Sequence, residues 1–264
     1  MPKVSVGGET LNYRRKGRGE PLLLVHSLGA AAWLWEEQIA RWSEHFDVIA
    51  FDVRGHGAST HNETVTIRAI ARDLHQAMSS LGLLPAHGVG LSMGGPILSR
   101  FYEIDPCAVK SLVIADSFAT QGEAGHERAK MLEARITSMG IEAYGQVYAD
   151  ETILPSTSRR HHAALRDSIA GCNQDAYIET VRSVFTEDVR SILASLKIPM
   201  MVAVGDKDNR TPSALSEAIV ALVPGAEYRL IPDAAHLANL DNPEGFHAAL
   251  DPFLLARTSD QRRK

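Results

Sequence analysis

Short runs of apolar residues recur along this chain, and most of them are separated by stretches with helical periodicity. Continuous apolar runs are typical of strands that are buried on both faces of a parallel sheet. The predicted strands lie at residues 4–6, 11–13, 22–25, 48–51, 88–91, 112–115, 200–204 and 228–231. Gly7 and Gly8 separate the first two runs, which predicts a hairpin there.

Two helices between these runs can be placed by their first residues. Apolar residues follow Thr66 at helical spacing up to position 81, so we expect Thr66 to cap this helix and Gly82 to end it. A second helix is predicted to begin at Thr211, the expected cap, with Pro212 in its first turn. Strands that alternate with helices predict an α/β fold with a parallel sheet covered on both faces.

One long segment, residues 119–195, contains no convincing strand. Helical patterns are present at 131–139 and 177–185. We therefore predict a core domain formed by residues 1–118 and 196–264, interrupted by a helical cap at 119–195.

Composition excludes several classes of protein. The chain has 264 residues, 45% hydrophobic and 22% charged, with a net charge of −5. These values indicate a globular protein without the basic footprint of a nucleic-acid binder. The only basic cluster, the tail at 262–264, is expected to be solvated. No apolar run approaches the ~20 residues of a membrane span. With no export signal visible and two distant cysteines, Cys107 and Cys172, we expect a cytoplasmic protein with free thiols.

The pentapeptide at 90–94 matches Gly-x-Ser-x-Gly and places Ser92 between a predicted strand and a helix-compatible stretch. At such a junction the hydroxyl projects above the sheet at a helix N-terminus, where free N–H groups favour a developing negative charge. The glycines allow the close backbone approach that a strained turn requires. The pattern predicts that Ser92 is a nucleophile. The alternative is a glycine-rich turn around an unreactive serine.

A serine nucleophile needs a general base and a third group that orients the base. His236 follows the last predicted strand, and Asp206 and Asp208 follow the strand at 200–204. The chain order serine, acid, histidine is that of enzymes with a Gly-x-Ser-x-Gly nucleophile. We predict His236 as the base and Asp208 as the acid, with Asp206 in a turn. Asp206 and Asp116 are the alternative acids.

Two backbone N–H groups must stabilise the oxyanion that forms when serine attacks a carbonyl. Met93, directly after the serine, and Leu28, in the loop after the third predicted strand, are the expected donors. His26, Ser27 and Trp35 are predicted to lie at the substrate pocket. For His26, hydrogen bonding that stabilises the loop is the main expectation and catalysis the alternative.

Five motifs in this order resemble the α/β-hydrolase superfamily over nearly the whole chain, from about residue 21. They are the front loop 26–29, the glycine-rich turn 52–59, the serine motif 90–95, the acid loop 205–212 and Ala235-His236. The front loop, the serine motif and residues 231–243 are most similar to 3-oxoadipate enol-lactone hydrolases. The resemblance implies an α/β-hydrolase fold with a helical cap, and hydrolysis of a small enol-lactone that carries a carboxylate.

We therefore expect a hydrolase of a small ester or lactone that uses an acyl-enzyme on Ser92 and no metal or organic cofactor. The alternatives are a cofactor-free haloperoxidase (perhydrolase) or a carbon–carbon bond hydrolase on the same three residues, or a non-enzymatic ligand receptor. The adjacent His161 and His162 point about 100° apart on a helix and are expected to be solvated rather than metal ligands. A substrate carboxylate would require a cap cation, for which four arginines are available: Arg128, Arg135, Arg159 and Arg160.

Overall fold

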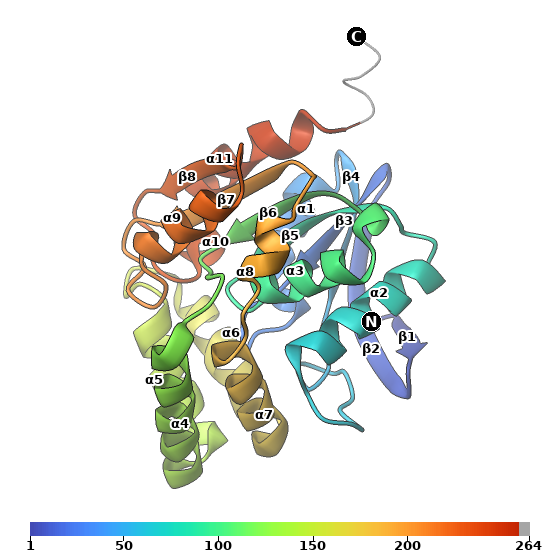
Figure 1. Ribbon diagram of the computed structural model, residues 1–264. Coiled ribbons are helices and arrows are strands. Elements are labelled where there is room, and N and C mark those ends of the chain that lie inside the picture. Colours follow the sequence, from blue (N-terminus) through green and yellow to red (C-terminus); the bar gives the residue numbers. More distant parts are fainter. Residues whose placement is uncertain (259–264) are drawn as a thin grey trace.

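A single eight-stranded sheet forms the centre of the protein, whose computed structural model describes residues 1–258 (Figure 1). The strand order is β1-β2-β4-β3-β5-β6-β7-β8; β2 pairs antiparallel with β1 and β4, and the other neighbours are parallel. Each predicted apolar run lies in one strand, which confirms the α/β class. The strands are β1 (Lys3–Val6), β2 (Glu9–Gly17), β3 (Glu20–Val25), β4 (Phe46–Phe51), β5 (Ala86–Leu91), β6 (Val109–Ala115), β7 (Met200–Gly205) and β8 (Glu227–Ile231). The basic tail at 262–264 lies outside the described residues.

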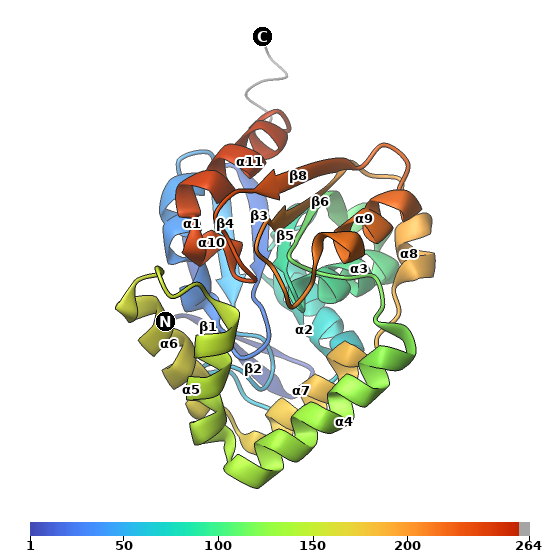
Figure 2. The same cartoon turned by 90° about the vertical axis from the view of Figure 1, so that its left-hand side faces the viewer.

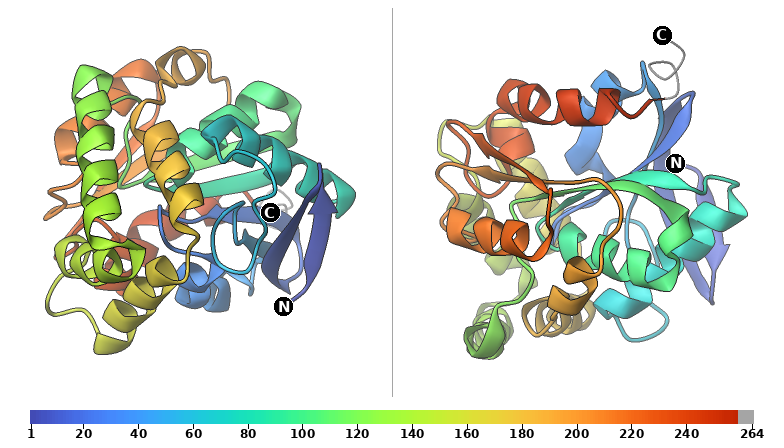
Figure 3. Two further views of the ribbon diagram at one scale, coloured as in Figure 1. Left: turned by 90° about the horizontal axis from the view of Figure 1, so that it is seen from below. Right: turned by 45° about the horizontal axis from the view of Figure 1, so that its top comes forward.

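Helices cover both faces of this sheet, as the continuous apolar runs predicted. Every residue of β4, β5 and β7 is buried, as expected for strands of a sheet that is covered on both faces. The helices α1 (Glu36–Trp42) and α11 (Pro243–Leu255) lie on one face (Figure 3). The other face carries α2 (Ile67–Ser80), α3 (Gly94–Ile104), α8 (Arg190–Ala194) and α9 (Ser213–Leu222).

The predicted start of α2 is confirmed, whereas that of α9 differs from the prediction. The Thr66 hydroxyl accepts a hydrogen bond from the backbone N–H of Ala69 at 3.1 Å, as an N-cap does. In α9 the cap residue is Pro212, and the helix begins at Ser213. Thr211 does not cap because its hydroxyl donates to Asp208 Oδ2 at 2.6 Å.

Between β6 and β7 the chain is fully described and has helices but no strand. The helices α4 (Gly122–Met139), α5 (Ile141–Thr152), α6 (Arg159–Ala170) and α7 (Gln174–Phe185) gather beyond one end of the sheet (Figures 1 and 2). The next helix, α8, instead packs against α3 and α9 of the core. The ends of the four-helix segment meet in an isolated bridge between Thr120 and Asp188. We propose that α4 to α7 form the cap and that α8 belongs to the core layer.

The remaining short elements complete the core. Trp33 and Trp35 lie in a 3-10 turn, η1 (Ala32–Trp35), that directly precedes α1. Another 3-10 turn, η2 (Pro106–Ala108), precedes β6, and α10 (Ala238–Asp241) precedes α11. Cys107 is exposed and Cys172 is buried, and both thiols are free. Among residues 1–258, no helix has the length and apolar character needed to cross a bilayer.

Candidate active site

Ser92 occupies a sharp turn between β5 and α3. Its φ is 54°, a left-handed conformation that is costly for a residue with a side chain. Residues at the end of β6 and directly after it hold the turn in place. The Ser92 N–H donates to the carbonyl of Ala115 at 2.8 Å, and the Ser117 hydroxyl donates to the Ser92 carbonyl at 2.7 Å. The strained serine is therefore fixed from the neighbouring strand.

The glycines around Ser92 are explained by backbone contacts. A Cβ at Gly94 would collide with the carbonyl oxygen of Val25 in β3, and one at Gly90 would collide with the Gly94 carbonyl. These contacts let α3 begin directly against the sheet. The N-terminus of this eleven-residue helix lies next to the serine, where its free N–H groups favour negative charge.

The three residues predicted as nucleophile, base and acid are joined by hydrogen bonds. His236 Nε2 lies 2.9 Å from Ser92 Oγ, and His236 Nδ1 lies 2.9 Å from Asp208 Oδ2. All three residues are buried. Ser92 comes from the β5–α3 turn, Asp208 from the loop after β7 and His236 from the loop after β8. The contacts span up to 144 residues of chain, so only the folded sheet brings these side chains together.

The carboxylate of Asp208 is surrounded by donors. Its Oδ1 accepts the backbone N–H groups of Arg210 and Thr211 at 2.8 and 2.9 Å, and its Oδ2 accepts the Thr211 hydroxyl as well as His236. Burial alone would raise the pKa of Asp208, but the charge of His236 and these hydrogen bonds hold it well below its usual range. Asp208 therefore stays ionised and keeps the Nδ1 proton of His236 directed toward itself.

The two alternative acids have other partners. Asp116 Oδ1 accepts the Gly205 N–H at 2.8 Å and Oδ2 accepts the Ala238 N–H at 3.3 Å. Burial, reinforced by the charge of Asp208, raises the pKa of Asp116 well above its usual range. Asp206 Oδ1 accepts the Ala234 N–H at 3.2 Å, as a turn residue does. Within the described chain neither carboxylate hydrogen-bonds to His236.

The loop after β3 lies next to Ser92. Leu28 and Met93 are buried, and their backbone N–H groups have no acceptor among residues 1–258. His26 holds this loop: its Nε2 accepts the Val53 N–H at 3.1 Å, so its Nδ1 carries the proton and donates to the Ser27 carbonyl at 2.7 Å. Burial lowers the pKa of His26 to about 4, which keeps the ring neutral.

A small cavity lies over Ser92, beneath the cap. It is lined by Leu28, Ser92, Phe118, Gln121, Arg128, Leu132, Tyr148, Val184, Phe185, Arg210, Thr211 and His236. Its volume of about 20 Å³ holds roughly one water molecule.

Three residues that the sequence placed at the pocket lie elsewhere in this conformation. Trp35 is fully buried and packs on Phe246 of α11, with ring centroids 6.3 Å apart. His26 and Ser27, which directly precede Leu28 in the chain, are buried and do not line the cavity. The Trp35 ring packs in the apolar core. The His26 ring accepts a hydrogen bond from the Val53 N–H and therefore does not line the cavity over Ser92.

Of the four cap arginines considered from sequence, only Arg128 lines the cavity. Arg135 pairs with Glu151 and Arg160 with Glu36 at the surface, while Arg159 is exposed. Sequence reasoning missed three polar lining residues: Gln121, Tyr148 and Arg210. Gln121 directly precedes α4 and is seven residues before Arg128, and this spacing was the signal that could have indicated it.

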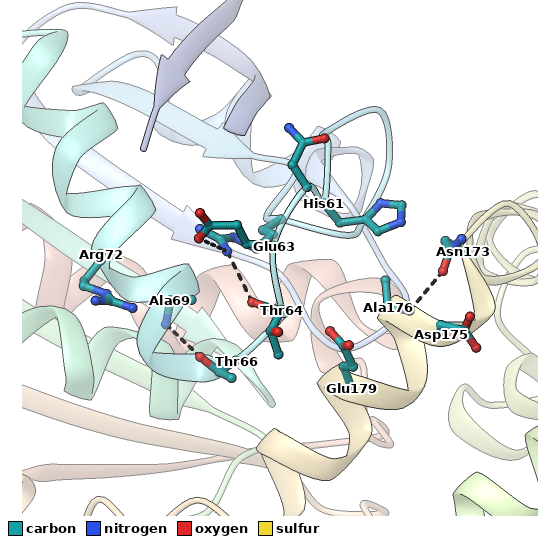
Figure 4. Close-up of a pocket in the computed structure, with 12 residues that line it drawn as sticks. His61, Glu63, Thr64, Thr66, Ala69, Arg72, Asn173, Asp175, Ala176 and Glu179 are labelled. Atoms are coloured by element: carbon teal, nitrogen blue, oxygen red, sulfur yellow. Dashed lines mark hydrogen bonds and ion pairs between the residues drawn. The ribbon is translucent and has the colours of Figure 1, made fainter. Parts of the chain in front are cut away.

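A larger hollow of about 800 Å³ lies away from Ser92 (Figure 4). It opens between residues 61–66, α2 and the start of α7, and it shares no lining residue with the cavity over Ser92. Its charges are mixed, since it is lined by Arg72 as well as by the carboxylates Asp175 and Glu179. The larger hollow is therefore not the one that contains Ser92 and His236.

The described residues contain no cluster of three or more His, Cys, Asp and Glu side chains that could hold a metal ion. His161 and His162 are half-buried rather than solvated, and they have different neighbours. His162 Nε2 lies 3.1 Å from the Leu154 carbonyl, and His161 Nε2 lies 3.9 Å from Glu37.

A strained serine between strand and helix, with a histidine at hydrogen-bonding distance, is the arrangement of a hydrolase with a nucleophile elbow. Residues 22–249 match the alpha/beta hydrolase family, and the chain belongs to this family. It is 25% identical over 252 residues to 3-oxoadipate enol-lactonase 1 of Acinetobacter baylyi, a match that covers 94% of each chain.

Solved structures agree with this assignment. A thermophilic esterase from Thermogutta terrifontis is 26% identical with a TM-score of 0.87, and the match covers 97% of this chain and 98% of the esterase. The enol-lactonase from Burkholderia xenovorans LB400 has the same identity of 26% and TM-score of 0.87, over 96% of this chain and 100% of the lactonase. The predicted α/β-hydrolase fold and the resemblance to enol-lactonases are confirmed, and hydrolysis of a small molecule is supported.

Proposed function

We propose that this protein hydrolyses a small carboxylic ester or lactone through an acyl-enzyme on Ser92. The observation that carries the proposal is the continuous chain of contacts from Ser92 Oγ to His236 to Asp208, each 2.9 Å long. A base within hydrogen-bonding reach of the hydroxyl, and an ionised acid behind the base, are the two requirements for activating a serine.

In the first half of the reaction, His236 Nε2 takes the proton of Ser92 while Oγ attacks the substrate carbonyl. The resulting imidazolium is stabilised by the carboxylate of Asp208. The N–H groups of Leu28 and Met93, which have no other acceptor in the described chain, stabilise the oxyanion. His236 then returns the proton to the leaving alkoxide or enolate oxygen, and the carbon–oxygen bond of the ester breaks.

In the second half, water attacks the acyl-enzyme with His236 again as the base. The tetrahedral intermediate collapses, Ser92 regains its proton and the carboxylic acid is released. In a lactone the acyl group and the leaving oxygen belong to one molecule. Ring opening therefore leaves both on Ser92, and hydrolysis of the acyl-enzyme releases a single product. The similarity to enol-lactonases makes 3-oxoadipate enol-lactone the first lactone to assay.

A chromogenic short-chain ester tests the proposal directly. Wild type is expected to hydrolyse 4-nitrophenyl butyrate, and Ser92→Ala is expected to lose about 10⁴-fold or more in kcat, because removal of a serine nucleophile has effects of this order. Ser80→Ala is the matched control, since that hydroxyl is exposed at the end of α2 and donates to the Gln76 carbonyl, and this variant should keep the wild-type kcat. Equal rates for wild type and Ser92→Ala would refute the mechanism.

A further inference from the structure

The Thr211 side chain contacts both the acid and the base of the candidate active site. Its hydroxyl donates to Asp208 Oδ2 at 2.6 Å, and the same oxygen lies 3.2 Å from His236 Nδ1. The backbone N–H of Thr211 adds a hydrogen bond to Asp208 Oδ1 at 2.9 Å. Since Asp208 Oδ2 lies 2.9 Å from His236 Nδ1, the three side chains form a closed triangle of polar atoms.

Thr211 also lies at the boundary between Asp208 and the cavity over Ser92. Of the three residues of the triangle, Thr211 and His236 line this cavity, and Asp208 does not. The Asp208 side chain is fully buried. Thr211 therefore binds the carboxylate from the cavity side, and without its hydroxyl a water molecule in the cavity would compete with His236 for Asp208 Oδ2.

The local sequence favours a different role for this hydroxyl. Thr211 stands directly before Pro212, in the pattern of a helix cap, but its hydroxyl is bonded to Asp208. Pro212 is the cap residue of α9 instead, and the side chain of proline has no atom that accepts a hydrogen bond. The helix thus forgoes the stabilisation that a capping hydroxyl gives. Departures of this kind from a local preference are expected at functional sites.

The positions of the protons in the triangle follow from its distances. The shorter contact, which is strengthened by the charge of the carboxylate, takes the Thr211 proton to Asp208 Oδ2, so the Thr211 oxygen presents only lone pairs to His236 Nδ1. A protonated Nδ1 fits between these two oxygens, whereas an Nδ1 without a proton would face lone pairs from both. The triangle therefore favours the tautomer of His236 whose Nε2 is free to accept the proton of Ser92.

We propose that Thr211 is a positioning residue of the reaction: its hydroxyl fixes the Asp208 carboxylate and, together with it, holds the Nδ1 proton of His236. This inference rests on the proposed function, because Thr211 acts through the acid and the base of the same site. The hydroxyl is directed at Asp208 rather than at the reacting atoms, so its effect reaches Ser92 only through His236. Its removal should therefore slow the chemical step and leave substrate binding nearly unchanged.

Two substitutions separate the hydroxyl of Thr211 from its shape. Thr211→Val keeps the shape and removes the hydroxyl, so kcat for 4-nitrophenyl butyrate should fall about 10- to 100-fold, as for loss of a hydrogen bond to a charged group, with KM within about twofold. Thr211→Ser keeps the hydroxyl and loses a methyl group, and it should recover most of the wild-type kcat. If Thr211 served packing alone, the order would be reversed, with serine the more impaired variant.

Thr64→Val is the matched control, since Thr64 is exposed and lines the larger hollow away from Ser92, and it should leave kcat unchanged. Thermal unfolding checks that each variant is folded, and Thr211→Ala, which also lacks the hydroxyl, replaces Thr211→Val if valine prevents folding. The proposal is overturned if Thr211→Val keeps the wild-type kcat or changes KM alone, or if Thr211→Ser loses as much activity as Thr211→Val.

A proton NMR signal keeps this test separate from that of the proposed function. The Nδ1 proton of His236, assigned by its absence in His236→Gln, should give a low-field signal in wild type and in Thr211→Ser that is lost to exchange with water in Thr211→Val. If wild type cleaves no ester, the proposed function has failed, and this signal still decides the role of Thr211. Its loss in Thr211→Val alone supports the proposal, and a signal that is equally strong or equally absent in wild type and Thr211→Val refutes it.

Discussion

The polar side chains on the two walls of the cavity over Ser92 differ in how many hydrogen-bond partners they have. On the core side, Asp208 accepts hydrogen bonds from two backbone N–H groups, one hydroxyl and one imidazole. On the cap side, Arg128 and Gln121 lie in the same cavity without a carboxylate or an amide acceptor. A fully bonded charge is fixed in position, which suits a group that orients a base. Arg128 donates to the Arg210 carbonyl at 3.2 Å and has no carboxylate partner in residues 1–258, so its charge is not fixed in this way.

The ion pair of Arg54 with Asp73 supports the same comparison. Arg54, in the glycine-rich turn after β4, donates to Asp73 through Nε and Nη2 at 2.7 Å each, and also to the Thr64 carbonyl. The side chains of Arg54 and Asp73 are each only 5% exposed, so this pair is internal to the core. Arg54 therefore has a structural role, whereas Arg128 has no carboxylate partner in residues 1–258.

The largest effect on kcat is expected from a substitution of Asp208, on the core side of the cavity. Asp208→Asn should lower kcat about 10⁴-fold, because the amide donates to His236 Nδ1 and moves the imidazole proton to Nε2, where it can no longer accept from Ser92. The measurement is steady-state hydrolysis of 4-nitrophenyl butyrate. Asp206→Asn, in the same loop but bonded to the Ala234 N–H, should stay within about threefold. If Asp208→Asn keeps its activity and Asp116→Asn loses it, the acid is Asp116.

Arg54→Met should lower the free energy of unfolding by about 3–5 kcal/mol, since it leaves the Asp73 carboxylate buried without its partner. Urea unfolding measures the change, and kcat of the folded enzyme should change less than about threefold. Arg68→Met, at a position on α2 whose side chain is 62% exposed, should stay within about 0.5 kcal/mol. A large loss of kcat without loss of stability would place Arg54 in the chemistry instead.

The neutral histidine of the front loop makes stability depend on pH. The pKa of His26 is lowered to about 4 by burial, whereas an unfolded histidine titrates near 6.5. Between these values the unfolded chain binds a proton that the folded chain does not, so this contribution is present above pH 6.5 and is lost as the pH falls toward 4. His26→Gln should reduce the slope of stability with pH by up to about 1.4 kcal/mol per unit in this window. Urea midpoints at pH 7 and pH 5 measure it, and an unchanged slope would contradict the depressed pKa; the exposed His126→Gln is the control.

The smallest effect is expected where the cap meets the histidine loop. Asp241 Oδ2 accepts the Ala235 N–H at 2.8 Å, and Oδ1 accepts the Leu154 N–H at 3.0 Å and the Thr157 hydroxyl. Asp241→Ala should lower kcat about three- to tenfold, because a net hydrogen bond that holds the loop of His236 is worth about 0.5–1.5 kcal/mol. Asp233→Ala changes an exposed carboxylate of the same loop and should have no effect on kcat. Equal kcat in the two variants would show that Asp241 does not position His236.

Much of the fold could be predicted from local pattern. Continuous apolar runs predicted the strands because a parallel strand covered on both faces has few polar positions. Thr66 and Gly82 indicated a helix because capping and left-handed conformations are local properties. Thr211 has the same local signature as Thr66, yet its hydroxyl binds Asp208 and the helix begins two residues later. Asp208, three residues earlier in the chain, binds this hydroxyl in the site, so the capping signature alone did not place the start of the helix.

The candidate site divides in the same way. Ser92, Asp208 and His236 were predicted as a set because each follows a strand, and parallel strands end at one edge of the sheet. Their catalytic roles stay predictions. The amino-acid sequence by itself thus determined the strands, the tight serine turn and the three polar residues at the sheet edge, since these depend on spacing. Only the tertiary structure decided that Trp35 packs in the core, that Arg128 rather than Arg135, Arg159 or Arg160 faces Ser92, and that Gln121 joins it. The physical reason is that the direction of a side chain on a cap helix depends on how the helix packs over the sheet, and no local pattern encodes that packing.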